Sequence, residues 1–272
     1  MIAAIYLTRA DRVRRAALFG FCALVLGFLV LPILAILPLS FNAGSFLSYP
    51  LSGLSLRWYR EIATAPEWGR ALSNSLVVGL ATALLATSLG TLAALGLSRL
   101  PKRTRSLLGV FLLSPLFVPV IITAVAVYFL YAPLHLANTY MGLVMAHTTL
   151  AAPYVVIVVQ ASLEGFDHNL LRAGASLGAS PARVFVRLLL PMVAPGVAAG
   201  AIFAFMTSFD ETVVAIFLAG PERRTLPLQM WDSVRDQVTP AITAVATVLV
   251  IVSAGLLAAA EAIRRSRERR TV

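Results

Sequence analysis

Long apolar stretches dominate this sequence, and they limit its possible folds more than any other feature. Six of them reach about 20 residues or more, at about 16–41, 70–98, 106–133, 138–163, 192–219 and 239–263. At about 1.5 Å of rise per residue, a helix of that length crosses a hydrocarbon core of about 30 Å. Backbone groups in lipid must find partners within the protein, so only helices or closed barrels span a membrane, and runs this long favour helices. The sequence therefore predicts an all-α polytopic membrane protein with six transmembrane helices in a single domain, 1–272.

The composition excludes an ordinary soluble protein. Apolar side chains make up 59% of the 272 residues and charged ones 12%, whereas a soluble globular domain has about 25% charged residues. The formal net charge of +10 could indicate nucleic-acid binding, but the arginines lie in the connections between apolar runs. Orientation in a membrane explains that distribution, so we expect contact with membrane lipid and no nucleic-acid partner. The single cysteine, Cys22, lies in an apolar run and can form no internal disulfide.

Lysine and arginine are distributed unevenly between the two sides of the predicted membrane domain. Sixteen of the 22 lie in the N-terminus, the 99–105 connection, the 164–190 segment and the C-terminal tail. The other six lie in or at the edges of the 42–69 and 220–238 connections. Because cytoplasmic loops carry the excess of positive charge, both termini and the 164–190 segment are predicted to be cytoplasmic. The basic N-terminus is like that of a signal peptide, but the apolar run after it, about 25 residues, is too long, so we expect a retained first span.

The segment 167–191 interrupts the apolar pattern with the order of two short helices joined at a glycine. Asp167 can cap the first helix, because its carboxylate can accept hydrogen bonds from the free amides of the first turn. Gly178 stands where a left-handed residue would end that helix. Ser180 and Pro181 then fit the N-cap and the first position of a second helix.

The second helix of this segment is predicted to be amphipathic. Arg183 and Arg187 are four residues apart and share one face, while apolar residues occupy another. Pro191 is predicted to mark the joint with the next apolar run. Together these features predict a compact two-helix elbow between two membrane spans.

This elbow resembles the cytoplasmic signature loop of binding-protein-dependent ABC importer permeases. That motif reads Glu-Ala-Ala, three residues, Gly, nine residues, then Ile-x-Leu-Pro. Gly178 holds the glycine position, and Leu188, Leu190 and Pro191 complete the end, whereas an Arg-Ala-Gly tripeptide stands where Glu-Ala-Ala is usual. The resemblance implies a coupling helix that docks into a groove on an ATPase subunit. The coupling residues that it implies are Arg172, Ala173, Gly174, Gly178, Ser180, Pro181, Arg183 and Pro191.

Two further stretches are similar to the second permease subunit of spermidine/putrescine importers. They read AHTTLAAPYVVIVVQASLEGFD, at 146–167, and SFDETVVAIFLAGPERRTLPLQMWDSV, at 208–234. The resemblance implies a type I ABC importer permease fold in the bacterial inner membrane. It also implies a homologous second permease, two cytoplasmic ATPases that bind ATP and Mg, and a solute-binding protein outside the cell membrane. The implied mechanism is alternating access, in which ATP binding opens the spans outward and hydrolysis returns them.

Asp210 and Glu211 are the candidate solute-path residues, since they fall inside the predicted fifth span. In an even span, Asp210 would lie about 7 Å to the outer side of the midplane. A carboxylate in hydrocarbon is costly, so we expect neither side chain to face lipid. Thr207 and Ser208 would add neutral polar lining. The alternative is that both carboxylates are structural, paired with an arginine or capping a break in the helix.

The sequence shows no catalytic or metal constellation, so we expect no enzyme activity in this chain. It has no C-x-x-C or H-E-x-x-H motif, and its three histidines lack metal-ligand spacing. The only lysine, Lys102, lies in LPKRTR, which is not a glycine-rich phosphate loop, so no cofactor is expected here. His147 is expected to be a hydrogen-bonded interior residue, with a proton relay as the alternative.

Local signals complete the expected layout. Prolines are expected to kink the third and fourth spans, and the short 135–138 connection predicts that those spans form a tight antiparallel pair. Trp58 and its aromatic neighbours are expected in an interfacial belt, or else on a surface for an outer partner. Other solutes of the same family (an amino-acid derivative, an opine or a phosphonate) remain possible, as do an ion-coupled secondary transporter and a structural membrane protein.

Overall fold

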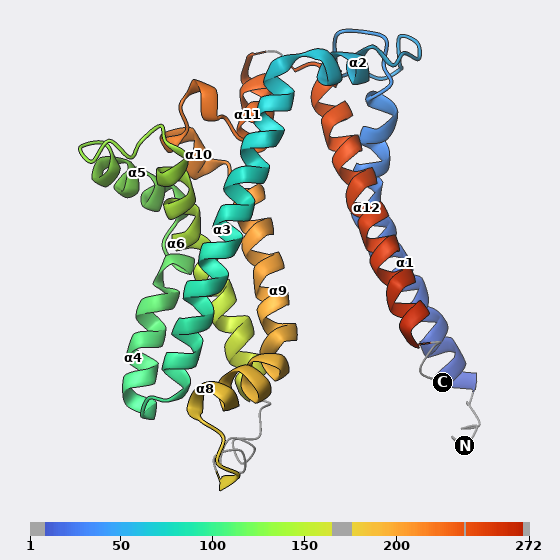
Figure 1. The fold of residues 1–272 in the computed structure, drawn as a ribbon. Helices are drawn as coiled ribbons and strands as arrows, with labels where there is room; N and C mark the ends of the chain where they lie inside the picture. Colours follow the sequence, from blue (N-terminus) through green and yellow to red (C-terminus); the bar gives the residue numbers. More distant parts are fainter. Residues whose placement is uncertain (1–8, 165–175, 237, 269–272) are drawn as a thin grey trace. The chain divides into compact units, whose positions relative to one another are not determined.

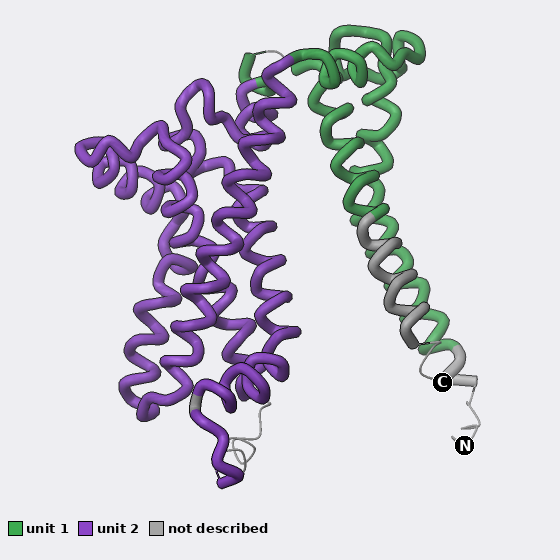
Figure 2. Tube along the Cα trace, in the orientation of Figure 1, with its two compact units in different colours: residues 1–65, 233–272 green, residues 66–232 purple. Residues whose placement is uncertain are grey.

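The computed structural model describes residues 9–164, 176–236 and 238–268, and the named elements within them are all helical (Figure 1). The chain divides into two compact units (Figure 2). One consists of residues 1–65 and 233–272, and the other of residues 66–232. The predicted all-α membrane class is therefore confirmed, while the single domain over 1–272 stays a prediction.

The first unit contains α1 (Arg9–Leu39), α2 (Arg57–Thr64) and α12 (Pro240–Glu268). α1 packs along α12, and α2 also contacts α12. The apolar side chains of α1 are largely exposed, as expected for a helix that faces lipid. Trp58 is not in an exposed belt, because it is buried and its indole donates a hydrogen bond to the backbone oxygen of Asn42, 2.8 Å away.

Three long helices form the core of the second unit (Figure 1). They are α3 (Pro66–Ser98), α6 (Tyr140–Glu164) and α9 (Leu190–Phe209), and each packs against the other two. Small residues let their backbones approach closely, as is common between membrane helices. A Cβ atom on Gly90 would lie only 2.7 Å from the Cβ atom of Val155.

The predicted third span, 106–133, is not one straight helix. It consists of α4 (Lys102–Leu113), a 3₁₀ turn η1 (Ser114–Leu116) and α5 (Val120–Tyr131), with a bend of 93° between the two parts. Two prolines cause the break, because Pro115 lies in the turn and Pro119 is the N-cap of α5, and proline cannot donate a backbone hydrogen bond.

The bend changes what α5 contacts. α5 packs mainly against α10 (Val213–Leu218) rather than along α6, so the predicted tight antiparallel pair is wrong. The connection itself is tight, since both His135 and Asn138 have positive φ angles, 55° and 61°. Pro153 produces no interruption of the helix, because α6 runs through it.

The predicted fifth span, 192–219, is wrong at both ends. The helix consists of α8 (Pro181–Val184), a π turn η2 (Phe185–Leu189) and α9, and its apolar span is Ala182–Phe209. Pro191 is therefore not a joint but an early residue of α9. The π turn explains how the helix accepts it, because the wider turn relieves the clash of a proline ring with the preceding turn.

The number of spans is only partly confirmed. Within the described residues, four helices are long and apolar enough to cross a membrane, and the bent pair makes a fifth if it counts as one span. Pro240–Gly255, in α12, is a shorter apolar helix. The remaining elements are η3 (Pro221–Arg223) and α11 (Leu226–Asp236).

Candidate functional site

The described part of the 167–191 elbow has the predicted local geometry. Gly178 adopts a left-handed φ of +77°, which a residue with a Cβ atom adopts only with strain. The hydroxyl oxygen of Ser180 accepts a hydrogen bond from the backbone N–H of Arg183 at 3.4 Å, and α8 begins at Pro181. The N-cap and the first helical position are therefore as predicted. The docking role of these residues stays a prediction.

The front of the elbow lies outside the described residues. This applies to Asp167 and to the Arg172, Ala173 and Gly174 positions of the signature. The second helix of the elbow is described and is amphipathic, since Val184 and Leu189 are buried whereas Arg183 and Arg187 are exposed.

Asp210 and Glu211 lie at a break between two helices and not within a span. α9 ends at Phe209, with Asp210 as its C-cap, and α10 begins at Val213. Glu211 accepts a hydrogen bond from the backbone N–H of Val214 at 2.9 Å, so its carboxylate caps α10. The predicted alternative, a carboxylate that caps a helix break, is therefore observed for Glu211. The side chain of Asp210 is exposed.

The two neutral residues before them, Thr207 and Ser208, also differ in their surroundings. Thr207 is half-buried, whereas Ser208 is buried and its hydroxyl lies 2.8 Å from the Nδ1 atom of His147. That hydrogen bond joins α9 to α6 inside the core. His147 is therefore the interior, hydrogen-bonded residue that its sequence position predicts, and Ser208 is its partner. The role of Thr207 and Ser208 as lining of a solute path stays a prediction.

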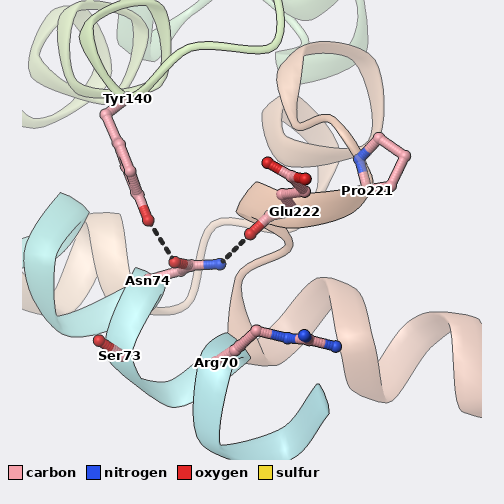
Figure 3. Close-up of a pocket in the computed structure, with 6 residues that line it drawn as sticks. All are labelled: Arg70, Ser73, Asn74, Tyr140, Pro221 and Glu222. Carbon is pink, nitrogen blue, oxygen red and sulfur yellow. Dashed lines mark hydrogen bonds between the residues drawn. The ribbon is translucent and has the colours of Figure 1, made fainter. Parts of the chain in front are cut away.

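The structure also contains a cavity that sequence reasoning missed, of about 570 Å³, between the beginnings of α3 and α6 and the turn η3 (Figure 3). We name it the Asn74 cavity after its most buried polar residue. A polar amide within an apolar run was the one available signal, since such a residue requires partners. The lining residues are Arg70, Ser73, Asn74, Tyr140, Pro221 and Glu222.

Asn74 connects the three walls of this cavity (Figure 3). Its Nδ2 group donates hydrogen bonds to the backbone oxygens of Glu222, at 3.0 Å, and Arg224, at 2.9 Å. Its Oδ1 atom accepts a hydrogen bond from the hydroxyl of Tyr140 at 2.6 Å. One amide thus holds α3, α6 and the η3 segment together.

No described group of histidine, cysteine, aspartate or glutamate side chains could hold a metal ion. The three candidate regions are the exposed basic elbow, the break between α9 and α10, and the polar Asn74 cavity.

Comparisons with known proteins identify the family to which this chain belongs. Residues 86–272 match the family described as binding-protein-dependent transport system inner membrane component. The chain is 31% identical over 248 residues to the spermidine/putrescine transport system permease protein PotC of Escherichia coli (strain K12), covering 91% of this chain and 94% of that protein. It is 33% identical over 236 residues to the putrescine transport system permease protein PotI of the same strain, covering 84% of each.

A solved structure has the same fold. The match is to a crystal structure of a bacterial ABC transporter involved in the import of the acidic polysaccharide alginate. The TM-score is 0.71 at 13% identity, over 96% of this chain and 99% of that one. The chain belongs to the family of binding-protein-dependent transport system inner membrane components, and it is a permease subunit of such a system.

Proposed function

We propose that this permease carries a polyamine of the spermidine or putrescine kind in an ATP-driven importer. The observation that supports this most is the similarity to PotC and PotI, which extends over most of the chain. A polyamine carries several positive charges, and Asp210 offers an exposed carboxylate where α9 ends. Glu211 is less suited to this role because its carboxylate already caps α10.

Energy for transport comes from other subunits in this proposal. The only lysine in the sequence, Lys102, is not in a phosphate-binding loop, so ATP and Mg bind to two cytoplasmic ATPase subunits. A homologous second permease completes the membrane part, and a solute-binding protein delivers the polyamine.

The 167–191 elbow is the part that contacts an ATPase. Leu177 is 88% exposed, and Arg183 and Arg187 present an exposed basic face further along the elbow. Exposed apolar side chains near arginines fit a protein interface better than a free surface. The excess of positive charge on this side supports a cytoplasmic position for the elbow and both termini in the bacterial inner membrane.

Uptake of radiolabelled spermidine and putrescine into proteoliposomes tests this function. The vesicles contain this chain, its partner permease and the ATPase, with the cognate binding protein outside and ATP inside. We expect uptake only when ATP and the binding protein are both present. Vesicles with a nonhydrolysable ATP analogue serve as the control for passive leak.

Two other outcomes have clear meanings. ATP-dependent uptake of an amino-acid derivative, an opine or a phosphonate instead would keep the importer and replace its solute. Uptake driven by an ion gradient through this chain alone would contradict the proposal and indicate a secondary transporter.

A further inference from the structure

The segment from Leu218 to Leu226 is fixed to the rest of the second unit by contacts along its length. The backbone N–H of Asn138 donates a hydrogen bond to the oxygen of Leu218 at 2.9 Å. A guanidinium N–H of Arg223 donates to the oxygen of Asn138 at 2.8 Å, and the same guanidinium lies 5.2 Å from the ring centroid of Tyr140. Further along, the backbone N–H of Leu226 donates to the hydroxyl oxygen of Ser75 at 2.7 Å.

Asn74 is the central contact of this segment. Its side chain is 5% exposed, and three of its hydrogen-bonding positions are used, two as donor and one as acceptor. A carboxylate could accept from Tyr140 but would repel the two backbone oxygens, and an alanine would make none of the three bonds. The position therefore requires a short side chain that carries both a hydrogen-bond donor and an acceptor, as the asparagine amide does.

Some charged side chains around the Asn74 cavity already have partners among the described residues of this chain, and others do not. Arg223 is bonded and stacked, and Arg224 forms an ion pair with Asp232 at 3.4 Å. Arg70 and Glu222 both line the cavity and are exposed. Neither forms an ion pair within the described parts of the chain.

The carboxylate of Glu222 and the guanidinium of Arg70 at the same cavity favour a partner that carries charges of both signs. A polycation would be attracted by Glu222 and repelled by Arg70, so the cavity does not suit the solute itself. A protein surface can present a basic and an acidic side chain at fixed spacing, and so satisfy both charges. In the orientation that we propose from the excess of positive charge, the beginning of α3 lies outside the cytoplasm. A solute-binding protein would approach the permease from that side.

We propose that the Asn74 cavity receives polar side chains of the solute-binding protein, and that Asn74 is the positioning residue of this docking site. Asn74 acts through its backbone contacts with the η3 segment, which set where Glu222 stands relative to Arg70 and Tyr140. The inference rests on the proposed function and adds the place at which the partner is recognised.

The test measures ATP hydrolysis by the complete transporter in nanodiscs as the concentration of binding protein is raised. In Asn74→Ala, we expect the half-saturating concentration of binding protein to rise about tenfold, the equivalent of losing one or two good contacts. The rate at saturating binding protein should stay within about twofold, because a positioning role weakens docking and not hydrolysis. General misfolding would instead lower the maximal rate.

Two further variants isolate the positioning role. Glu222→Ala should raise the half-saturating concentration in the wild-type background and should add little in the Asn74→Ala background, because Asn74 acts by placing that region. Tyr140→Phe keeps the ring beneath Arg223 and removes one bond to Asn74, so it should give a smaller rise in the same direction. Ser88→Ala is the control, since this exposed α3 serine bonds only within its own helix.

The outcomes separate this inference from the function on which it rests. A wild-type complex that no binding protein stimulates contradicts the proposed function, and this inference with it. A stimulated wild-type complex whose Asn74→Ala variant keeps its half-saturating concentration contradicts the docking role alone, as do fully additive effects of Asn74→Ala and Glu222→Ala.

Discussion

At Gly90 the backbones of α3 and α6 come so close that there is no room for one added methyl group. A Cβ atom there would lie 2.7 Å from the Cβ and 2.9 Å from a methyl carbon of Val155, a fully buried residue. We expect Gly90→Ala to destabilise the protein by about 1–3 kcal/mol, since extra volume in a packed core forces neighbours to move. Thermal unfolding in detergent should show a lower midpoint.

Gly96→Ala is the matched control for that prediction. Gly96 lies on the same helix, and a Cβ atom there would meet nothing within 4 Å. The change should leave the midpoint equal or slightly higher, because alanine is the better helix former. Equal midpoints for both variants and the wild type would show that the close contact between α3 and α6 is absent.

Asp210 and Glu211 are adjacent in the sequence but differ in what they do. Asp210→Asn should weaken the apparent affinity for a polyamine by up to about fivefold, the value of one exposed charge pair. Glu211→Gln should change it less, because the amide oxygen can still accept the hydrogen bond from the N–H of Val214. Concentration-dependent uptake of putrescine by each variant measures the difference.

A larger loss of affinity in Glu211→Gln than in Asp210→Asn would reverse these assignments. The sequence predicted that neither carboxylate faces lipid, which stays a prediction, and it did not assign a separate role to each. The reason is physical: Val213–Leu218 continues the apolar run after the break, so hydropathy alone does not reveal that α9 ends at Phe209.

Among the elements, the turn at 178–181 within the elbow matches its prediction, because its signals are local. The left-handed Gly178, the cap at Ser180 and the first helical position at Pro181 depend on neighbours in the sequence, and all three are observed. The bend between α4 and α5 was predicted only as a kink. Proline removes a hydrogen bond, but the direction that the chain then takes depends on packing against α10, which is distant in the sequence.

The conformation of Gly178 leads to a prediction about coupling. Gly178→Ala imposes about 1–2 kcal/mol of backbone strain at a left-handed residue, although nothing lies within 4 Å of the new atom. We expect ATP hydrolysis to continue while polyamine uptake per ATP falls, because the strained turn no longer holds the elbow in its docking shape. Simultaneous assays of phosphate release and uptake measure this ratio.

Gly178→Asn is the control for the coupling prediction. Asparagine tolerates the left-handed conformation better than alanine does, so it should retain more of the coupling. Identical uptake per ATP in the wild type and both variants would mean that this turn does not transmit the motion.

For the molecule as a whole, the class was predictable and the assembly of distant parts was not. Runs of apolar residues give helices without any tertiary information, which is why the beginnings and ends of α3 and α6 were close to expectation. At the Asn74 cavity, Asn74 forms hydrogen bonds with Tyr140 and Arg224, which are 66 and 150 positions away in the sequence. Only three-dimensional packing brings them together, and the one signal in the sequence was the amide of Asn74, between Ser73 and Ser75 at the start of an apolar run.

The central claim is that this permease receives its motion from a separate ATPase through the 167–191 elbow. Photo-cross-linking tests it most directly, with a photoreactive amino acid in place of Leu177, which is 88% exposed beside the elbow's glycine. Placement at Leu84, 70% exposed on the apolar α3, is the control and should give no protein adduct. We predict an adduct between position 177 and the co-expressed ATPase subunit in membranes. An intact complex that gives no such adduct, with or without ATP, would contradict the claim.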